Sequence, residues 1–426
     1  MKILLVEPDF PIPPKSKNHK NFLPIGLLKI GRYLKNTRKV TKVKLVIGNS
    51  RSGFVPDEIW ITSLFTYWSE YFWESVKFYR SAYPNSIIRV GGIYVSLHFD
   101  NKDFKEKCKQ YRVKPHFGLY DKAERCLPDY KLITQNPHSL NYQIIHSTRG
   151  CPRHCKFCYT WEVEPNFASK PSIKNEVCSN KLVFYDNNLL MNEHIDKLLK
   201  EISELKHNGK MVRCEAQSGF DGWVLEERPE LAIALKKAMF DNPRIAWDGN
   251  YSQWRRTEKH IQILGNAGYH EKDIYVFMIF NWDIPFLEME KKRLKCWEWK
   301  VQITDCRYRP MIQLYDNFNS RIPQTPEDYF IHQKWSDAEV KQFRRNVRRQ
   351  NICVRQGFRF HSGLLERKRV SKKLSMKLRF LPQKAILKRV QDAWFPDEIC
   401  KPPTVLSSKS KRMTTSDKND LWRKWV

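Results

Sequence analysis

Apolar, strand-like segments alternate with helix-like segments along most of this chain of 426 residues, and this order constrains the fold more than any other feature. In the first part the expected strands are 2–7, 43–47, 58–64 and 87–90. The expected helices are 24–34 and 71–83. Strands separated by helices form parallel sheets with helices on both faces. The sequence therefore predicts an α/β fold that begins with a Rossmann-like domain over residues 1–135. Its ligand-binding loops should follow the carboxyl ends of the strands.

A second series of alternating segments begins near Tyr142. Its expected strands are 142–147, 181–186, 211–216, 244–248, 274–280 and 300–304. Helical patterns lie between most of them, such as 194–206 and 230–239. Six strand–helix units in succession are typical of a partial or complete parallel (β/α) barrel, in which the chemistry lies at the carboxyl ends of the strands. We therefore expect a barrel domain over residues 136–330.

Positive charge is concentrated after this series. The chain has 76 Lys and Arg against 46 Asp and Glu, a net charge of +30, and residues 331–426 hold 25 of the former and 8 of the latter. A helix is expected over 335–350, with Ser336 as its N-cap. Its arginines would form a positive stripe along one side: Arg344, Arg345, Arg348 and Arg349.

We therefore expect a basic, mostly helical C-terminal extension over residues 331–426. Two interpretations of its charge remain open. The charged side chains form a solvated surface, or they contact the phosphates of nucleic acid or an anionic substrate. On the strand just before the extension, Asp305 is expected to form a local ion pair with Arg307 and Arg309, unless these arginines reach an anionic substrate.

Composition indicates a cytoplasmic protein without a membrane partner. No segment has the roughly 20 consecutive apolar residues of a transmembrane helix. The first residues do not resemble a signal peptide, because the apolar run is short and acids follow at Glu7 and Asp9. Most of the 11 cysteines are scattered, which is typical of small core residues rather than of a disulfide framework.

Three cysteines nevertheless lie within eight residues, in Arg149-Gly-Cys151-Pro-Arg-His-Cys155-Lys-Phe-Cys158. Their spacing is C-x3-C-x2-C, just beyond the first strand of the second series. Three thiolates this close together can bind one inorganic cluster from a single loop. The alternative is a structural zinc site, with His154 or a distant cysteine as fourth ligand. Zinc ribbons usually have paired C-x2-C units, however, and no second pair is present.

This spacing resembles the signature of the radical S-adenosylmethionine superfamily, C-x3-C-x-aromatic-C, with Phe157 as the aromatic residue. The resemblance implies that Cys151, Cys155 and Cys158 hold a [4Fe–4S] cluster and leave one iron open for S-adenosylmethionine. It further implies reductive cleavage of that cofactor to start radical chemistry on a substrate. An electron donor such as a flavodoxin or ferredoxin is implied as a partner. The substrate and the later reaction are not implied.

The N-terminal half resembles the cobalamin-binding domain that precedes the radical domain in one subgroup of this superfamily. The segments that carry the likeness are MKILLVEP, Leu23-Pro-Ile-Gly-Leu-Leu, 87–97, 117–128 and 181–192, so that it extends over residues 1–310. The Asp-x-His-x-x-Gly motif that supplies a histidine to cobalt is absent. Either cobalamin binds without a protein histidine, or the domain has lost this cofactor.

The segment after the second strand of the series is the first candidate for binding S-adenosylmethionine. In the superfamily a Gly-Gly-Glu sequence there contacts the amino group of the cofactor, and this chain has Asp186, Asn187 and Asn188 instead. These polar groups can still accept hydrogen bonds from an ammonium. The alternative is a local turn and helix cap.

Four further candidates for cofactor binding follow later strands. Glu215 and Gln217 are two residues apart on one strand and therefore share a face, which would line the barrel. The alternative for this pair is a polar layer bridged by water. Asp248 ends the next expected strand and Asn281 follows the one after it, and an ordinary turn is the alternative for each of them.

Two other functions remain open from the sequence. A zinc-stabilised nucleic-acid-binding protein without catalysis would account for both the cysteines and the charge. A radical S-adenosylmethionine enzyme that modifies RNA would account for them as well.

Overall fold

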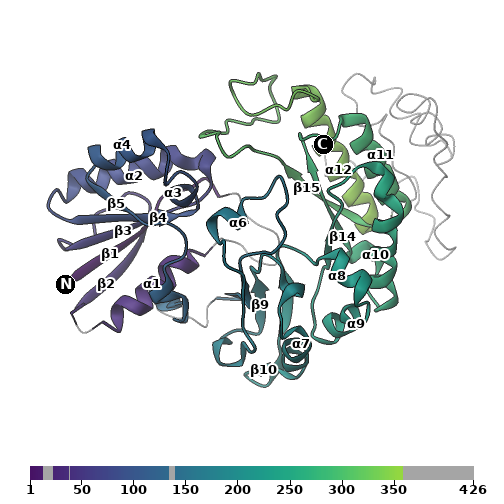
Figure 1. Ribbon diagram of the computed structural model, residues 1–426, viewed down its shortest axis with the longest axis horizontal. Helices are drawn as coiled ribbons and strands as arrows, with labels where there is room; N and C mark the ends of the chain where they lie inside the picture. Colours follow the sequence, from purple (N-terminus) through teal and green to yellow (C-terminus); the bar gives the residue numbers. More distant parts are fainter. Residues whose placement is uncertain (13–22, 38, 134–139, 358–426) are drawn as a thin grey trace, which may run out of the picture.

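The computed structural model of the protein describes residues 1–12, 23–37, 39–133 and 140–357 (Figure 1). The part of the expected basic extension that follows residue 357 lies outside the described residues. We call the described residues up to 133 the N-terminal domain and residues 140–357 the second unit.

The N-terminal domain is built on one five-stranded parallel sheet in the order β2-β1-β3-β4-β5. Its strands are β1 (Lys2–Glu7), β2 (Lys42–Ile47), β3 (Glu58–Ser63), β4 (Ile87–Gly92) and β5 (Val113–Pro115). The first four confirm the strands expected from the sequence. The three-residue β5 was not predicted, because so short a segment shows no periodicity.

Helices cover both faces of this sheet (Figure 1). They are α1 (Ile25–Lys35), α2 (Ser69–Ala82), α3 (Ile93–Leu97), α4 (Lys102–Gln110) and α5 (Asp121–Glu124). Along β1, Leu4 packs in one hydrophobic cluster with Phe72 of α2, whereas Leu5 packs in another with Leu27 of α1. A strand buried on both faces has no polar alternation, which is why β1 is a continuous apolar run in the sequence.

The second unit contains two three-stranded parallel sheets, in the orders β12-β9-β6 and β13-β14-β15. These strands are β6 (Gln143–Ile145), β9 (Lys181–Phe184), β12 (Arg213–Ala216), β13 (Arg244–Ala246), β14 (Tyr275–Phe280) and β15 (Gln302–Arg307). Two isolated parallel bridges, Cys214–Phe240 and Phe220–Ile245, lie between the two sheets. The expected strands of the second series are therefore confirmed, and all of them run parallel to their neighbours.

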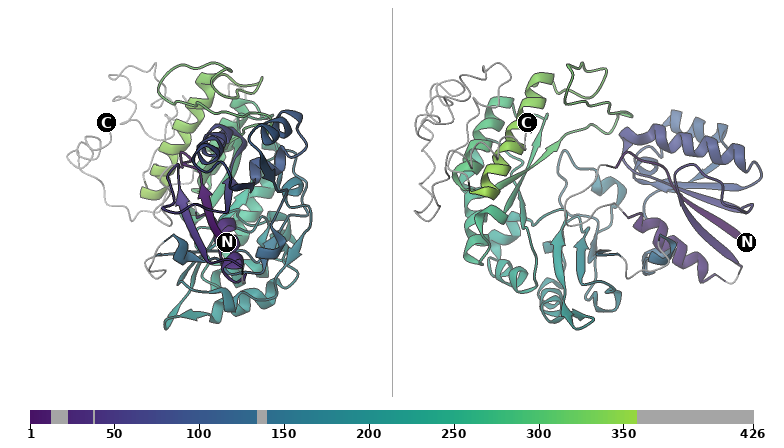
Figure 2. Two further views of the ribbon diagram at one scale, coloured as in Figure 1. Left: turned by 90° about the vertical axis from the view of Figure 1, so that its left-hand side faces the viewer. Right: turned by 180° about the vertical axis from the view of Figure 1, so that it is seen from behind.

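Short antiparallel pairs and a layer of helices complete the second unit. The pairs are β7 (Thr148–Arg149) with β8 (Ala168–Ser169), and β10 (Lys206–His207) with β11 (Lys210–Met211). The helices are α6 (Thr160–Val163), α7 (Ile195–Glu204), α8 (Gly222–Glu227), α9 (Glu230–Lys237), α10 (Trp254–Asn266), α11 (Phe286–Glu298) and α12 (Asp337–Gln356). Figures 1 and 2 show α8 to α12 on the outer side of β14 and β15. No helix in the described ranges is both long and apolar enough to cross a bilayer.

The basic helix α12 is packed into the second unit. It begins at the expected N-cap Ser336, whose hydroxyl accepts a hydrogen bond from the Glu339 backbone while Glu339 caps the Ser336 N–H in return. Val340 and Phe343 belong to the same hydrophobic cluster as β14. Of the expected stripe of arginines, Arg344 and Arg345 are half-buried, and Arg348 and Arg349 are exposed. The positive surface of α12 is therefore narrower than its sequence indicates.

Candidate cofactor site at the cysteine loop

The three clustered cysteines lie on the loop between β7 and α6, here called the cysteine loop (residues 150–159). In Figure 1, α6 lies in the middle of the molecule, and β1 points its carboxyl end towards this region. The loop begins at Gly150, which has a φ of 69°. A Cβ at this position would be 2.5 Å from the carbonyl oxygen of Asn166. Only glycine fits such a turn, so the backbone at Gly150 directs the chain into the loop.

The thiols of Cys151, Cys155 and Cys158 are half-buried and form no disulfide. Burial raises the pKa of Cys151, and the charge of Cys158 adds to this effect. Burial also raises the pKa of Cys155, and the charges of Asp248 and both other thiols add to it. The three sulfurs are therefore close enough to interact electrostatically. Phe157, before the last of them, is half-buried as well.

The surroundings of the loop bear on the alternative of a zinc site. Within the described ranges, no three His, Cys, Asp or Glu side chains are arranged to hold a metal ion. His154 is exposed and its ring stacks on Trp161 at 5.3 Å. His154, the fourth zinc ligand suggested by the sequence, therefore has its ring engaged with Trp161.

Asp186 holds the segment that leads into the cysteine loop. Its Oδ1 accepts hydrogen bonds from the backbone N–H and the hydroxyl of both Ser147 and Thr148, at 2.5 to 2.9 Å. The side chain is completely buried, and this burial raises the pKa of Asp186 although the four donors oppose it. Its second oxygen, Oδ2, is buried without a hydrogen-bond partner.

The two asparagines after Asp186 connect the end of β9 to the loop and its surroundings. Asn187 donates to Glu164 at 3.2 Å, and Asn188 donates to Asp221 at 2.9 Å. The carboxylate of Asp221 also pairs with Arg153 of the cysteine loop at 3.0 Å. The side chain of Asn188 does not cap the short helix that follows it. From the sequence, Asp221 is a turn residue first and a site candidate second; its pairing with Arg153 joins positions too distant in sequence to be matched by pattern.

Glu215 and Gln217 lie on the neighbouring strand and just beyond its end. Glu215 is buried and forms an ion pair with Arg244, which also donates to the carbonyl of Ala216 at 2.7 Å. Only one oxygen of Glu215 is used in this way. Its Oε2 and the Oε1 of Gln217 are both buried without a hydrogen-bond partner.

Four buried oxygens at the carboxyl ends of β9 and β12 thus lack a donor: Asp186 Oδ2, Asn188 Oδ1, Glu215 Oε2 and Gln217 Oε1. All four are acceptors. A buried acceptor without a partner costs about 1–3 kcal/mol and is uncommon in folded proteins. This group of oxygens therefore fits a ligand that supplies donors, such as an ammonium or hydroxyl groups.

Asp248 follows β13. Its charge adds to the rise in the pKa of Cys155, so Asp248 lies near the cysteine loop. Burial raises the pKa of Asp248 to about 6, and the ammonium of Lys292 opposes this rise. Lys292 is fully buried and donates to the carbonyls of Trp247 and Gly249 at 2.7 and 2.9 Å. It thereby fixes the backbone on both sides of Asp248. Lys292 was not predicted from the sequence, because a lysine on a helix is ordinarily a surface residue.

Asn281, the remaining candidate, is used within the chain. It is fully buried and has a left-handed φ of 57°. Its Nδ2 donates to the carbonyl of Phe330 at 2.7 Å, and its Oδ1 accepts from the N–H of His332 at 2.9 Å. The amide of Asn281 therefore fastens residues 330–332 to the end of β14, and the structure does not bring it into the group of unpaired acceptors.

The carboxyl edge of the N-terminal sheet is lined by aromatic rings. In a parallel sheet of this order, the switch point between β1 and β3 is where ligands bind. Phe10, after β1, stacks on Trp68, after β3, with ring centroids 5.6 Å apart. Phe65 and Tyr67 stack beside them at 5.1 Å. Neither stacked pair offers a ligand to cobalt.

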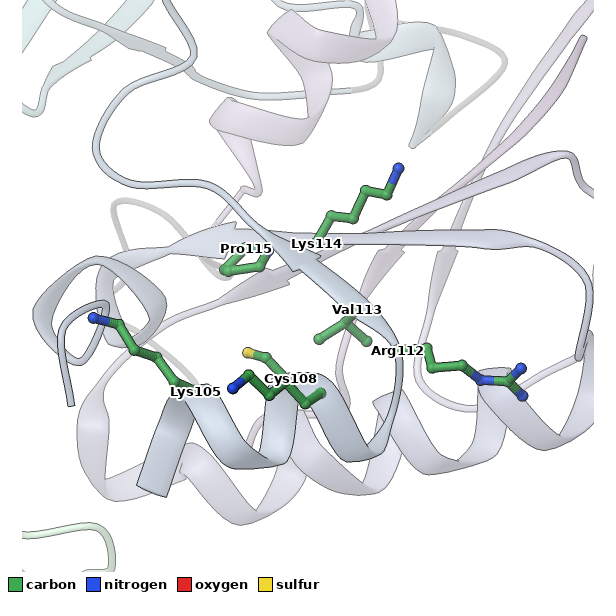
Figure 3. Close-up of a pocket in the computed structure, with 7 residues that line it drawn as sticks. Lys105, Cys108, Arg112, Val113, Lys114 and Pro115 are labelled. Carbon is green, nitrogen blue, oxygen red and sulfur yellow. The ribbon is translucent and has the colours of Figure 1, made fainter. Parts of the chain in front are cut away.

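Figure 3 shows a separate hollow of about 490 Å³ between α4 and β5. Its lining combines basic residues with a largely apolar surface: Lys105, Cys108, Lys109, Arg112, Val113, Lys114 and Pro115. None of these residues belongs to the candidate site. Burial raises the pKa of Cys108 to about 11, so that its thiol stays protonated at neutral pH. The hollow therefore holds no group suited to the chemistry of the cysteine loop.

Comparison with known proteins does not assign the chain to a family. No protein-family model matches it, and no curated protein is significantly similar to it.

Proposed function

We propose that this chain is a radical S-adenosylmethionine enzyme in which Cys151, Cys155 and Cys158 hold a [4Fe–4S] cluster. The observation that carries the proposal is the position of the three thiols on one half-buried loop, beside four buried acceptor oxygens without donors. Three protein ligands leave one iron of such a cluster open. The acceptors match the ammonium and hydroxyl groups of S-adenosylmethionine.

The two parallel sheets of the second unit act in this proposal as the two parts of a partial barrel. The first sheet supplies the unpaired acceptors at the ends of β9 and β12, and the second supplies Asp248 beside Cys155. The chemistry that the bound cofactors supply is one-electron cleavage of a carbon–sulfur bond followed by hydrogen-atom transfer from a substrate, with the electron delivered by a flavodoxin or ferredoxin.

The protein's own residues bind and orient. Gly150 sets the turn into the cysteine loop, and Asp186 holds Ser147 and Thr148 ahead of it through four hydrogen bonds. The ion pair of Arg153 with Asp221 fixes the loop between the first two cysteines. Asn188 lies beside Cys151 and partly opposes the rise in the pKa of its thiol that burial causes. A loop fixed at several points presents its sulfurs in one geometry, which cluster binding requires.

Metal analysis of anaerobically purified protein tests this proposal. We expect about four iron and four sulfide per chain in the wild type, with visible absorbance that bleaches on reduction. Cys158→Ala should lose most of the iron. Cys178→Ala is the matched control, since Cys178 is exposed and lies outside the loop. A colourless wild-type protein with stoichiometric zinc would overturn the proposal in favour of a zinc-stabilised nucleic-acid-binding protein.

Cobalamin is not part of the proposed function. The Asp-x-His-x-x-Gly motif is absent from the sequence, and Phe10 stacks on Trp68 across the switch point of the N-terminal sheet. We derive no step through this cofactor.

RNA as the substrate is a second candidate within the same enzyme class. Arg348 and Arg349 are exposed on α12, and the sequence after residue 357 is strongly basic. An excess of positive charge favours association with phosphates. The salt dependence of RNA binding tests this candidate, because each phosphate that the protein neutralises releases counterions.

A further inference from the structure

We infer that the N-terminal domain positions the cysteine loop through a relay of ion pairs formed by Lys29, Glu124, Arg149 and Glu164. We call this set the loop relay. Its importance for catalysis rests on the proposed function, whereas its effect on the loop itself does not. The N-terminal domain thereby has a role that requires no cofactor in that domain.

The relay begins within the N-terminal domain. Lys29 on α1 donates to Glu124, the last residue of α5, with Nζ 2.9 Å from Oε2. The same carboxylate receives Arg149 of β7 from the second unit, with Nε and Nη2 at 3.0 to 3.1 Å from its two oxygens. Glu124 therefore pairs with one cation of the N-terminal domain, Lys29, and one of the second unit, Arg149. A bidentate arginine–carboxylate pair fixes both distance and orientation.

The relay ends on the turn that opens the cysteine loop. Arg149 also contacts Glu164, with Nη1 at 3.3 Å from Oε1. The other oxygen of Glu164 accepts from the N–H of Gly150 at 2.8 Å and from Asn187 at 3.2 Å. The carboxylate of Glu164 thus holds both the turn at Gly150 and the side chain of Asn187, which lies between two residues with unpaired acceptors. A shift of Glu124 would move Arg149 and, through Glu164, both of these groups.

Burial makes this relay more than an ordinary surface contact. The side chains are 6% exposed for Lys29, 23% for Glu124, 20% for Arg149 and 13% for Glu164. Burial would raise the pKa of Glu124, but Arg149 and Lys29 together lower it below its usual value, so Glu124 is ionised at neutral pH. Partly buried ion pairs add little to stability because of their desolvation, yet removing one partner leaves charges unpaired. Their contribution is therefore to geometry.

Hydrogen exchange of the full-length chain prepared without iron tests the relay directly. Glu124→Gln keeps the shape of the side chain and removes its charge. We expect the amides of residues 148–158 to exchange about tenfold faster, because local opening no longer breaks the ion pairs. The control is Glu58→Gln, which breaks a similar bidentate pair with Arg89 in the same domain but away from the loop. The control should leave the exchange of 148–158 unchanged.

A double-mutant comparison separates a relay from independent contacts. If the inference holds, Arg149→Gln and Glu124→Gln together accelerate exchange no more than Arg149→Gln alone, since Glu124 acts through Arg149. Additive effects, or unchanged exchange in Glu124→Gln, would overturn the inference. If circular dichroism shows that Glu124→Gln does not fold, Glu124→Asp takes its place, because aspartate keeps the charge on a shorter side chain. We then expect a smaller acceleration of exchange in residues 148–158. No acceleration in this segment would count against the relay.

These outcomes are distinct from a failure of the proposed function. If the wild type binds no iron, the enzyme proposal fails while the exchange data still decide on the relay. If iron is bound and exchange is insensitive to Glu124, the relay fails alone. For the iron-loaded protein we additionally expect Glu124→Gln to change the electron paramagnetic resonance spectrum of the reduced cluster, which the Glu58→Gln control should not do.

Discussion

Glu7 provides a test of the structure that does not depend on any cofactor. It is the last residue of β1, is 4% exposed, and its carboxylate has no ion pair or hydrogen bond with any described residue. Burial raises the pKa of Glu7 from 4.5 to about 7. We predict that the free energy of unfolding of Glu7→Gln, measured against that of the wild type, increases as the pH is raised from acid to alkaline.

The size of the effect follows from the pKa of Glu7. Since the folded state binds this proton more tightly than the unfolded state, the stabilising contribution is complete below pH 4.5 and is lost as the pH rises through about 7. At about 1.4 kcal/mol for each tenfold change in proton affinity, the wild type loses about 3 kcal/mol that the glutamine variant does not lose. The change with pH, rather than the absolute stability, isolates the carboxyl group from the packing of the new amide.

Urea unfolding followed by tryptophan fluorescence, at several pH values from 4.5 to 8.5, gives the free energy of unfolding of each protein. The control is Glu106→Gln, because Glu106 is an exposed residue of α4 and its replacement should leave the pH dependence unaltered. If the difference between Glu7→Gln and the wild type varied by less than about 1 kcal/mol over this range, Glu7 would not be buried without a partner, and the reasoning would be refuted.

Two further predictions concern the cysteine loop and the basic helix. Gly150→Ala places a Cβ 2.5 Å from the carbonyl oxygen of Asn166, so we expect it to destabilise the loop by about 1–3 kcal/mol and to lower the iron content; full iron with an unchanged urea midpoint would contradict this. Replacing Arg348 and Arg349 by Gln should reduce the slope of log affinity against log salt for RNA by up to about 2, because each arginine that binds a phosphate accounts for about 1. An unchanged slope would argue against α12 as an RNA-binding surface.

The positions of the strands along the chain and the cluster of cysteines could be predicted because both depend on local pattern. Continuous apolar runs such as 2–7 marked the buried strands, and Ser336 with Glu339 marked the start of α12. The three cysteines were recognised by spacing alone, without knowledge of the fold. In each case the signal lies within a few residues of sequence.

Partners that are distant in sequence could not be predicted in the same way. Asp305 was expected to pair with Arg307 and Arg309, but both arginines pair with Asp316 and Asp305 instead contacts Arg344. In a chain with 76 Lys and Arg and 46 Asp and Glu, every carboxylate has many partners of suitable charge. Which one it meets depends on tertiary packing rather than on proximity in sequence.

The same reason explains what was missed around the site. The bonds from Ser147 and Thr148 to Oδ1 of Asp186 were not predicted, because these residues lie almost 40 positions apart in the sequence. Glu124 and Lys29 carried no signal at all, since each lies in an ordinary helical segment. Their relation to the cysteine loop is visible only once both halves of the chain are folded.

The central claim is that the cysteine loop supports reductive cleavage of S-adenosylmethionine. The most direct test is to reconstitute the cluster anaerobically, add S-adenosylmethionine and a strong reductant, and measure 5′-deoxyadenosine and methionine by chromatography. Both products should form with the wild type and with Cys178→Ala, and neither should form with Cys155→Ala. A wild-type protein that carries its full complement of iron and yields no 5′-deoxyadenosine would contradict the account.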